Sequence, residues 1–251
     1  MQRPVLAANW KMNHGPTEAR AFMAAFLARY SPRNDRTIAI FPPALSLSTV
    51  RDSIASRTDI FLGVQNIHSE PKGAFTGENS AAMARDAGAR MVLVGHSERR
   101  HVFGETDAAT TKKCAIALKN SLLPILCVGE KIEQRESGQT EEIVVRQLRA
   151  GLAEVAATEF GRMLIAYEPV WAIGTGKNAT PADASAVHAV IRRELAKHFA
   201  SDESAAAIPI LYGGSVNREN AKSLLDAAEV DGLLVGGASL EASSWSAIAS
   251  T

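Results

Sequence analysis

The stretch MLIAYEPVWAIGTGK (residues 163–177) decides the fold. Its first five residues are apolar, the run ends at Glu168, and the loop that follows starts with a proline and ends near two glycines. A run that is apolar throughout, rather than alternating, is typical of a strand covered on both faces, as in a parallel sheet. The stretch therefore predicts a buried strand, and it raises the question of why a carboxylate stands at its end.

Similar apolar runs recur along the whole chain. The seven others are VLAANW (5–10), TIAIF (37–41), IFLGVQ (60–65), MVLVG (91–95), LPILCVG (123–129), IPILYGG (208–214) and GLLVGG (232–237). Helical patterns lie between them; one starts near Thr17, one stops at Gly88, and one starts at Thr180 with a capping hydroxyl followed by proline.

Eight such runs in 251 residues give about 31 residues per unit, the length of one βα repeat. No linker composition or low-complexity segment interrupts this rhythm. We therefore predict an α/β protein, a single closed (β/α)₈ barrel domain over residues 1–251. An open, doubly wound sheet is the alternative, because the pattern alone does not separate the two.

The charge and cysteine content narrows the function classes. Lysine plus arginine and aspartate plus glutamate number 27 each, so no net field favours nucleic acid or an anionic membrane. No apolar run approaches the ~18 residues of a membrane span, and the N-terminal segment does not have the pattern of a signal peptide. Cys114 and Cys127 form no CxxC pair, which argues against disulfides and structural zinc and predicts a reducing, cytoplasmic location.

In a barrel of this kind the active groups stand at the carboxyl ends of the strands. The first strand run ends in Asn9 and Lys11, which are two residues apart and point the same way on an extended chain. An inward lysine needs a negative partner. Either this lysine serves a site at the barrel mouth, or it simply turns outward.

His96 follows the fourth apolar run and opens a polar, helical segment. The partial positive charge of a helix N-terminus disfavours the imidazolium, so a histidine here tends to stay neutral and donate a hydrogen bond. Taken alone, a histidine at this place is more typical of a surface residue in a turn than of a catalytic group.

Glu168 ends the sixth run. At the mouth of an apolar barrel a carboxylate has a raised proton affinity and suits a general base; the alternative is a loop acid paired with a lysine or arginine. The loop behind it has a stiff start and a glycine-rich end, which predicts a lid that excludes water. That lid comprises Pro169, Val170, Trp171, Ala172, Ile173, Gly174, Thr175, Gly176 and Lys177.

Glycine pairs end the last two runs, at Gly213-Gly214-Ser215 and at Gly236-Gly237. Loops at these two places often bind phosphate through backbone amides. Turn geometry explains one such pair, but two in neighbouring units favour a phosphate site. The six histidines have no HxxxH or HExxH spacing, so we predict no metal.

Six strings together resemble the triosephosphate isomerase family: NWKMN (9–13), GAFTGE (73–78), GHSERR (95–100), YEPVWAIGTGK (167–177), LYGGSV (211–216) and LVGGASL (234–240). The strings occur in the family's order and at its spacing, and the resemblance extends over essentially the whole chain. The resemblance implies a TIM barrel that interconverts dihydroxyacetone phosphate and glyceraldehyde 3-phosphate without metal or organic cofactor.

The resemblance also implies roles for particular residues. Glu168 would be the base, and His96 would be the neutral electrophile at the carbonyl. Lys11 would stabilise enediolate and phosphate charge, Asn9 would orient the substrate, and Glu98 would be a supporting acid. The amides that hold the phosphate would be those of Gly174, Ser215, Gly236 and Gly237.

A homodimer is implied as well, because family members usually pair. The segment around Thr76 would enter the neighbouring subunit near Asn9 and Lys11, and Glu78 and Arg99 would form an acid–base pair across the contact. A simple capped helix start is the other interpretation of Phe75 to Glu78. His14 and the segment 67–72 look less typical of the family.

Two other functions remain open at the level of sequence. A related sugar-phosphate isomerase or a Schiff-base aldolase would use the same fold, and an aldolase would need a desolvated lysine, for which Lys11 is the candidate. A binding module without catalysis would need the phosphate site but not Glu168.

Overall fold

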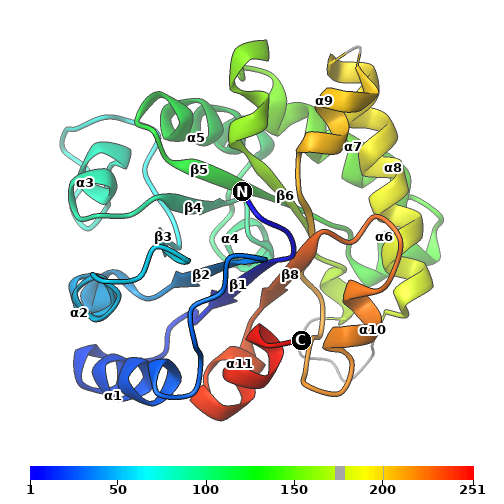
Figure 1. The fold of residues 1–251 in the computed structure, drawn as a ribbon. Coiled ribbons are helices and arrows are strands. Elements are labelled where there is room, and N and C mark those ends of the chain that lie inside the picture. Colours follow the sequence, from blue (N-terminus) through cyan, green and yellow to red (C-terminus); the bar gives the residue numbers. More distant parts are fainter. Residues whose placement is uncertain (173–178, 200) are drawn as a thin grey trace.

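The computed structural model describes residues 1–172, 179–199 and 201–251. Eight parallel strands follow one another around a closed barrel (Figure 1). Their bounds are β1 (Val5–Asn9), β2 (Thr37–Phe41), β3 (Ile60–Val64), β4 (Met91–Val94), β5 (Leu123–Val128), β6 (Leu164–Tyr167), β7 (Ile210–Tyr212) and β8 (Gly232–Val235). Strand β1 pairs with β8 from Val5 opposite Gly232 to Ala8 opposite Val235, which closes the sheet. The predicted barrel is confirmed, and the open sheet is wrong.

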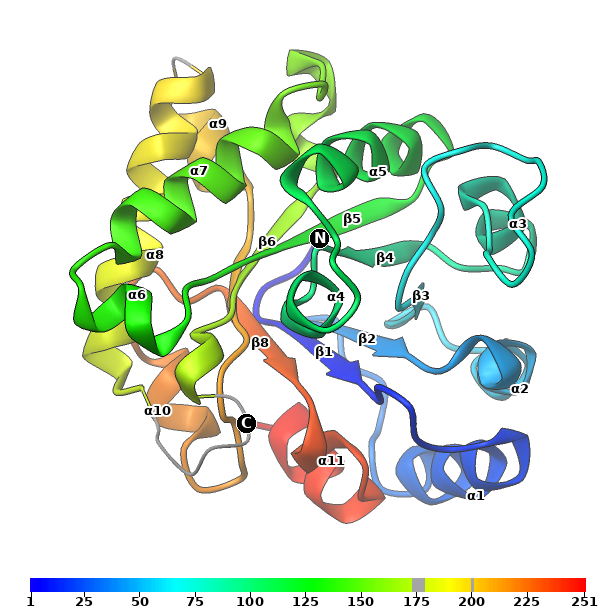
Figure 2. The same ribbon diagram turned by 180° about the vertical axis from the view of Figure 1, so that it is seen from behind.

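Helices surround the barrel on its outer side, as the view from behind in Figure 2 also shows. Helices α1 and α11 lie side by side, so that the first and last units of the chain meet. The α-helices are α1 (Pro16–Leu27), α2 (Leu47–Ser53), α3 (Ala81–Asp86), α4 (Ser97–His101), α5 (Asp107–Lys119), α6 (Ile132–Glu136), α7 (Thr140–Leu152), α8 (Pro181–Phe199), α9 (Asp202–Ala207), α10 (Ala221–Leu225) and α11 (Ala242–Ala249). The 3₁₀ turns are η1 (Ala44–Ser46), η2 (Ala157–Arg162), η3 (Val170–Ala172) and η4 (Gly237–Ser239).

Two apolar layers explain why the strand runs are apolar throughout. Alternate residues of each strand fill the barrel interior, while the others pack under the helices. In β1, for example, Val5 and Ala7 point inward, whereas Leu6 and Ala8 face the helices. Cys127 belongs to the interior layer and Cys114 to the outer one, and both are free and buried.

Two helix signals predicted from the sequence are confirmed: the capped start at Thr180 and the glycine stop at Gly88. The Thr180 hydroxyl accepts from the Asp183 amide at 3.1 Å, and the Asp183 carboxylate accepts from the Thr180 amide at 2.9 Å, which is a reciprocal cap for α8. Gly88 follows α3 with φ +95°, in the left-handed region that ends helices.

Several boundaries differ from the sequence prediction. Most of the predicted strands run one or two residues too long at an end, because Trp10 and the glycine pairs after β7 and β8 lie in loops rather than in the sheet. Phe75 to Glu78 do not start a helix: helix α3 starts at Ala81, and Ser80 caps it by accepting from the Met83 amide. In the described ranges, no helix is both long and apolar enough to cross a bilayer.

Candidate active site

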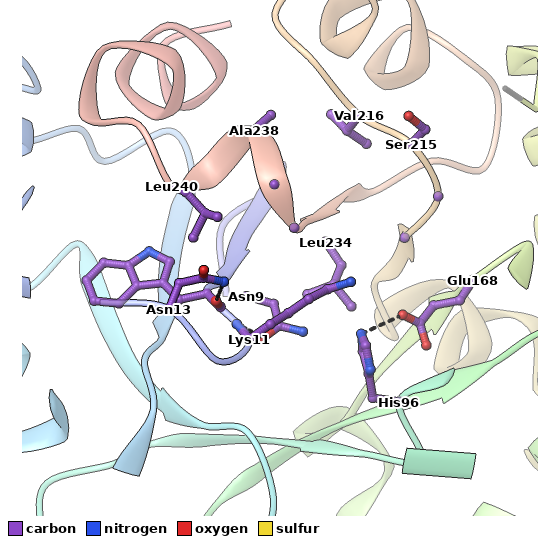
Figure 3. Close-up of a pocket in the computed structure, with 15 residues that line it drawn as sticks. Asn9, Lys11, Asn13, His96, Glu168, Ser215, Val216, Leu234, Ala238 and Leu240 are labelled. Carbon is purple, nitrogen blue, oxygen red and sulfur yellow. Dashed lines mark hydrogen bonds and ion pairs between the residues drawn. The ribbon is translucent and has the colours of Figure 1, made fainter. Parts of the chain in front are cut away.

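A pocket of about 410 Å³ opens where the strands end at their carboxyl side. It brings together most of the residues singled out from the sequence (Figure 3). Its lining consists of Asn9, Trp10, Lys11, Asn13, His96, Glu168, Gly213, Gly214, Ser215, Val216, Leu234, Gly236, Gly237, Ala238 and Leu240. Residues from five units of the barrel thus share one cavity, as the strand-end argument predicts.

The end of β1 positions an amide and a cation. Asn9 is buried, and its Oδ1 accepts from the Lys11 amide at 3.1 Å. Lys11 has φ +51°, so it reaches the pocket through a left-handed turn. We predicted from the alternation of side chains along an extended strand that Lys11 points into the barrel mouth. Lys11 does line the pocket, but the left-handed turn places it there, so the reason we gave for its direction is wrong. Its Nζ lies 2.7 Å from the Glu98 carboxylate.

The turn from β4 into α4 carries His96. Gly95 has φ +71° and makes the turn, and His96 caps the helix. The Glu98 amide donates to His96 Nδ1 at 3.3 Å. An amide donor needs a lone pair at Nδ1, so this contact assigns the ring hydrogen to Nε2. His96 Nε2 lies 3.0 Å from Glu168 Oε1.

Glu168 stands directly after β6 and is only 2% exposed. Its Oε2 accepts from the Ser97 amide at 2.8 Å, while its own amide donates to the Val128 carbonyl at 2.8 Å. The carboxylate therefore contacts two consecutive residues where the β4–α4 turn enters the helix, and Figure 3 shows the contact with His96. The acid and the imidazole, which are 72 positions apart in the sequence, form one buried pair.

The pKa of Glu168 differs from the sequence expectation. Burial raises the pKa of this carboxyl, but His96, the Ser97 amide and Lys11 outweigh burial and leave it below its ordinary value. We predicted a raised proton affinity from the apolar surroundings alone. That prediction is wrong for this arrangement, because it did not include the donors that face the carboxylate.

The pKa of His96 is subject to opposing influences. Burial lowers it, while the Glu168 carboxylate, and to a lesser degree Glu98, raise it above 6.5. The amide that donates to Nδ1 favours the neutral ring, because a protonated Nδ1 would face that N–H group. The Nε2–H of a neutral ring satisfies Glu168 equally well.

The loops after β7 and β8 offer free amides to the pocket. Within the described residues, the backbone N–H groups of Ser215, Gly236 and Gly237 donate to no other protein atom. A side chain at position 236 would approach Lys11 Cε within 3.3 Å, so the bare backbone lies beside the Lys11 ammonium. Uncommitted amides beside a cation suit an anion.

The start of the predicted lid is anchored by a residue that the sequence analysis did not single out. Glu130 is completely buried, and its Oε1 accepts from the Trp171 indole at 2.9 Å and from the Tyr167 hydroxyl at 3.1 Å. It comes soon after the fifth apolar run, just as Glu168 follows the sixth, so the same signal could have found it. Of the predicted lid, Pro169, Val170, Trp171 and Ala172 are described; Ile173, Gly174, Thr175, Gly176 and Lys177 lie outside the described residues.

Gln147 is a second residue without a signal in the sequence. It lies on α7, is 3% exposed, and its amide group both accepts from the Gly129 N–H and donates to the Gly129 carbonyl. Gly129 in turn lies against the Glu168 backbone. No local pattern distinguishes Gln147 from the other polar side chains on the same helix.

The residues predicted for a dimer contact lie apart from the pocket lining. Thr76 and Glu78 are exposed, in a loop that is exposed from residue 70 to residue 79. Within the chain, Arg99 pairs with Glu105 at 2.8 Å.

Over the described ranges, no group of three or more histidine, cysteine, aspartate or glutamate side chains could hold a metal ion. A closed (β/α)₈ barrel with a buried carboxylate–imidazole pair and free amides at its mouth defines an enzyme class suited to proton transfer on small anions.

Sequence comparison identifies the family within this class. Residues 4–251 match the family model described as triosephosphate isomerase. Relatives with this name include those of Roseiflexus sp. (50% identical over 98% of this chain and 96% of the relative) and Herpetosiphon aurantiacus (48% over 98% and 97%). The one from Symbiobacterium thermophilum is 46% identical over 99% of this chain and 96% of its own. The chain belongs to the triosephosphate isomerase family, which is a family of isomerases.

Proposed function

We propose that this protein interconverts dihydroxyacetone phosphate and D-glyceraldehyde 3-phosphate by proton transfer through an enediolate. The observation that carries the proposal is the buried Glu168–His96 pair, with Nε2 and Oε1 3.0 Å apart in a pocket that also holds Lys11. Membership of a family whose named relatives are triosephosphate isomerases supports the choice of substrate.

The roles follow from the chemistry. The Glu168 carboxylate takes a proton from the hydroxyl-bearing carbon, a C=C bond forms, and the carbonyl electron pair moves onto its oxygen. His96 Nε2 donates its proton to that oxygen and takes the proton of the neighbouring hydroxyl, and the carboxyl of Glu168 returns its proton to the former carbonyl carbon, which leaves a carbonyl at the other position. The oxygen that becomes negative needs donors aimed at it. His96 Nε2–H and the Lys11 ammonium are the donors, Asn9 orients the substrate, and Glu98 holds Lys11 through their 2.7 Å contact.

Before this step the carboxylate has to leave its present partners. In the structure Glu168 accepts from the Ser97 amide and faces His96 Nε2, which lowers its pKa and its strength as a base. A substrate carbonyl that takes over the His96 hydrogen bond would free the carboxylate. Binding of substrate and activation of the base are then one event.

The phosphate group would sit on the loops after β7 and β8. The free amides of Ser215, Gly236 and Gly237, with Lys11 beside them, support this placement. The segment Pro169 to Lys177 would act as the lid, with Gly174 as a further phosphate amide. A closed lid excludes water from the enediolate, which otherwise loses its phosphate.

We also propose a homodimer, with Thr76, Glu78 and Arg99 at its interface. Large apolar side chains are exposed in the first four units of the barrel: Met12, Leu45, Phe75, Met83, Val102 and Phe103. Met12 and Phe103 line a second cavity of about 230 Å³ that also touches Asn9, Lys11 and His96. A partner loop seated there would cover apolar surface next to the catalytic residues.

Reaction by acid–base chemistry needs no metal or organic cofactor, and none is proposed. The two free, buried cysteines are in keeping with a reducing, cytoplasmic location. An aldolase of the Schiff-base kind is a weaker candidate, since Lys11 is 28% exposed and paired with Glu98 rather than desolvated. A binding module would not require the buried Glu168.

The test is turnover in a coupled triose phosphate assay, together with incorporation of solvent deuterium into the sugar. We expect the Glu168→Gln variant to bind substrate while its turnover falls about 10²–10⁴-fold, because the amide keeps the shape but cannot accept a proton. No deuterium exchange by the wild type, or unchanged turnover in the variant, would refute the proposal.

A further inference from the structure

His14 lies in the loop between β1 and α1 and reaches across to the opposite end of the chain. Its Nε2 is 3.0 Å from the carbonyl oxygen of Leu240, 226 positions away in the sequence. In the part of the chain that the structure describes, this is the one side-chain hydrogen bond between residues 10–15 and residues 236–242. It therefore links the loop that carries Lys11 to the turn η4.

The chemistry of this contact defines which nitrogen of the His14 ring carries a hydrogen. A carbonyl oxygen only accepts, so His14 Nε2 must carry the hydrogen and donate it. The ring is held in that orientation from two sides: its centroid is 4.8 Å from that of Trp10 in an edge contact and 5.3 Å from that of Phe22. The Ser46 hydroxyl also donates to the His14 carbonyl at 2.6 Å, which fixes the backbone there.

The other end of the contact is the turn η4, which Gly236 precedes and Gly237 starts; these are two of the residues whose amides have no acceptor among the described residues. η4 covers Gly237 to Ser239, and the Ser239 hydroxyl donates to the Gly236 carbonyl at 2.7 Å. Leu240, which His14 contacts, closes the turn by donating its amide to the Gly237 carbonyl at 3.1 Å. The turn is thus held internally by Ser239 and externally by His14.

We propose that His14 is a positioning residue for anion binding, which sets the distance between the Lys11 ammonium and the Gly236–Gly237 amides. This inference rests on the proposed function, in which these groups hold the substrate phosphate. His14 touches no substrate; it acts through Leu240, because loss of the contact lets the turn and the Lys11 loop move independently. A cation and amides that no longer keep a fixed spacing bind an anion more weakly.

Two variants separate hydrogen bonding from packing. His14→Phe keeps an aromatic ring against Trp10 and Phe22 but has no donor for Leu240. His14→Gln loses the ring but places an N–H donor at nearly the position of Nε2. We expect His14→Phe to raise KM for glyceraldehyde 3-phosphate and the Kd for inorganic phosphate in parallel, by about three- to tenfold, as for one hydrogen bond. Its kcat should change by less than about twofold, because Glu168 and His96 are untouched. His14→Gln should restore both constants to near the wild-type values.

Binding of inorganic phosphate is measured by calorimetry and the kinetics by the coupled assay. If His14 only packs, His14→Phe will behave as the wild type and His14→Gln will be the impaired variant, which overturns the inference. An equal fall in kcat and kcat/KM would also overturn it. If the wild type lacks isomerase activity, the proposed function fails, yet the phosphate constants of the two variants still decide the role of His14.

Discussion

Two glutamates follow neighbouring strands of this barrel, and their partners set them apart. Glu130 after β5 accepts from the aromatic donors Tyr167 and Trp171. Glu168 after β6 faces an imidazole and a helix amide. The first arrangement anchors a loop, while the second couples an acid to a group that can itself titrate. At the residue scale, the hydrogen-bond partners of each glutamate, rather than the residue type, determine what its carboxylate can do.

The coupling of Glu168 and His96 gives a prediction on a pKa. In the Glu168→Gln variant the largest influence that raises the pKa of His96 is removed, while burial and Lys11 continue to lower it. We expect the pKa of His96 to fall below its ordinary 6.5, as measured by NMR titration of the imidazole nitrogens. The matched variant Glu98→Gln should produce a smaller fall. A His96 pKa that is the same in all three proteins would contradict the pairing.

At the scale of elements, the junction of β5 and β6 determines where the base stands. A methyl group on Gly129 would lie 1.7 Å from the Glu168 carbonyl oxygen, which leaves no room for any side chain. The Gly129 peptide is not free to shift, because Gln147 on α7 clamps both its N–H and its carbonyl. Helix α7 thus contributes to the position of Glu168 without touching the pocket.

The expected result for Gly129→Ala is a loss of both stability and turnover. Overpacking of this kind costs about 1–3 kcal/mol of unfolding free energy, and the displaced Glu168 backbone should lower kcat at least about tenfold. Chemical denaturation and the coupled assay measure the two effects. Gly161→Ala is the control, since no atom of the described residues, its chain neighbours aside, lies within 4 Å of the added carbon there. A Gly129→Ala enzyme that matches this control would disprove the clamp.

At the scale of the molecule, the exposed apolar side chains of Met12 and Phe103 line a cavity next to the catalytic residues. We expect the wild type to sediment as a dimer at micromolar concentration, and Phe103→Lys to shift it toward the monomer, because a lysine would bring an unpaired charge into the contact. Activity should fall with dimer content. Glu142→Lys, on the exposed face of α7, should leave the dimer intact. A wild type that is monomeric and fully active would refute the proposed dimer.

A buried histidine should make the whole fold sensitive to acid. His188 on α8 is completely buried, its Nδ1 lies 2.8 Å from the Glu229 carbonyl, and its Nε2 has no partner in the described structure. Burial lowers the pKa of His188 to about 4. Between pH 6.5 and 4 the unfolded chain therefore binds a proton that the folded protein refuses, and folding stability falls as the pH falls.

The full effect of His188 is about 3 kcal/mol, complete above pH 6.5 and lost toward pH 4. Carboxylates contribute to acid unfolding as well, so the measurement is a difference between two proteins. Urea denaturation at pH 7 and pH 4.5 should show a smaller loss for His188→Gln than for the wild type. Equal losses would mean that His188 takes up its proton in the folded state.

The sequence by itself determined eight βα units with a parallel sheet and the places where chemistry is found, but its apolar pattern did not separate a closed barrel from an open sheet; the pairing of β1 with β8 decided that. Apolar runs without alternation, a repeat of about 31 residues and polar groups at the strand ends are local signals, since they depend on the covering of each strand and on turn chemistry. Glu168, His96 and the glycine pairs were found in this way, and all of them line the pocket.

Only the tertiary structure decided how these residues are held. The clamp of Gln147 on Gly129, the contact of His14 with Leu240 and the lowered pKa of Glu168 all join residues from different units. The left-handed turn at Lys11 likewise depends on the buried Asn9 side chain. A sequence pattern records what each segment prefers, whereas a hydrogen bond or a pKa depends on which groups the closed barrel brings within about 3 Å of each other.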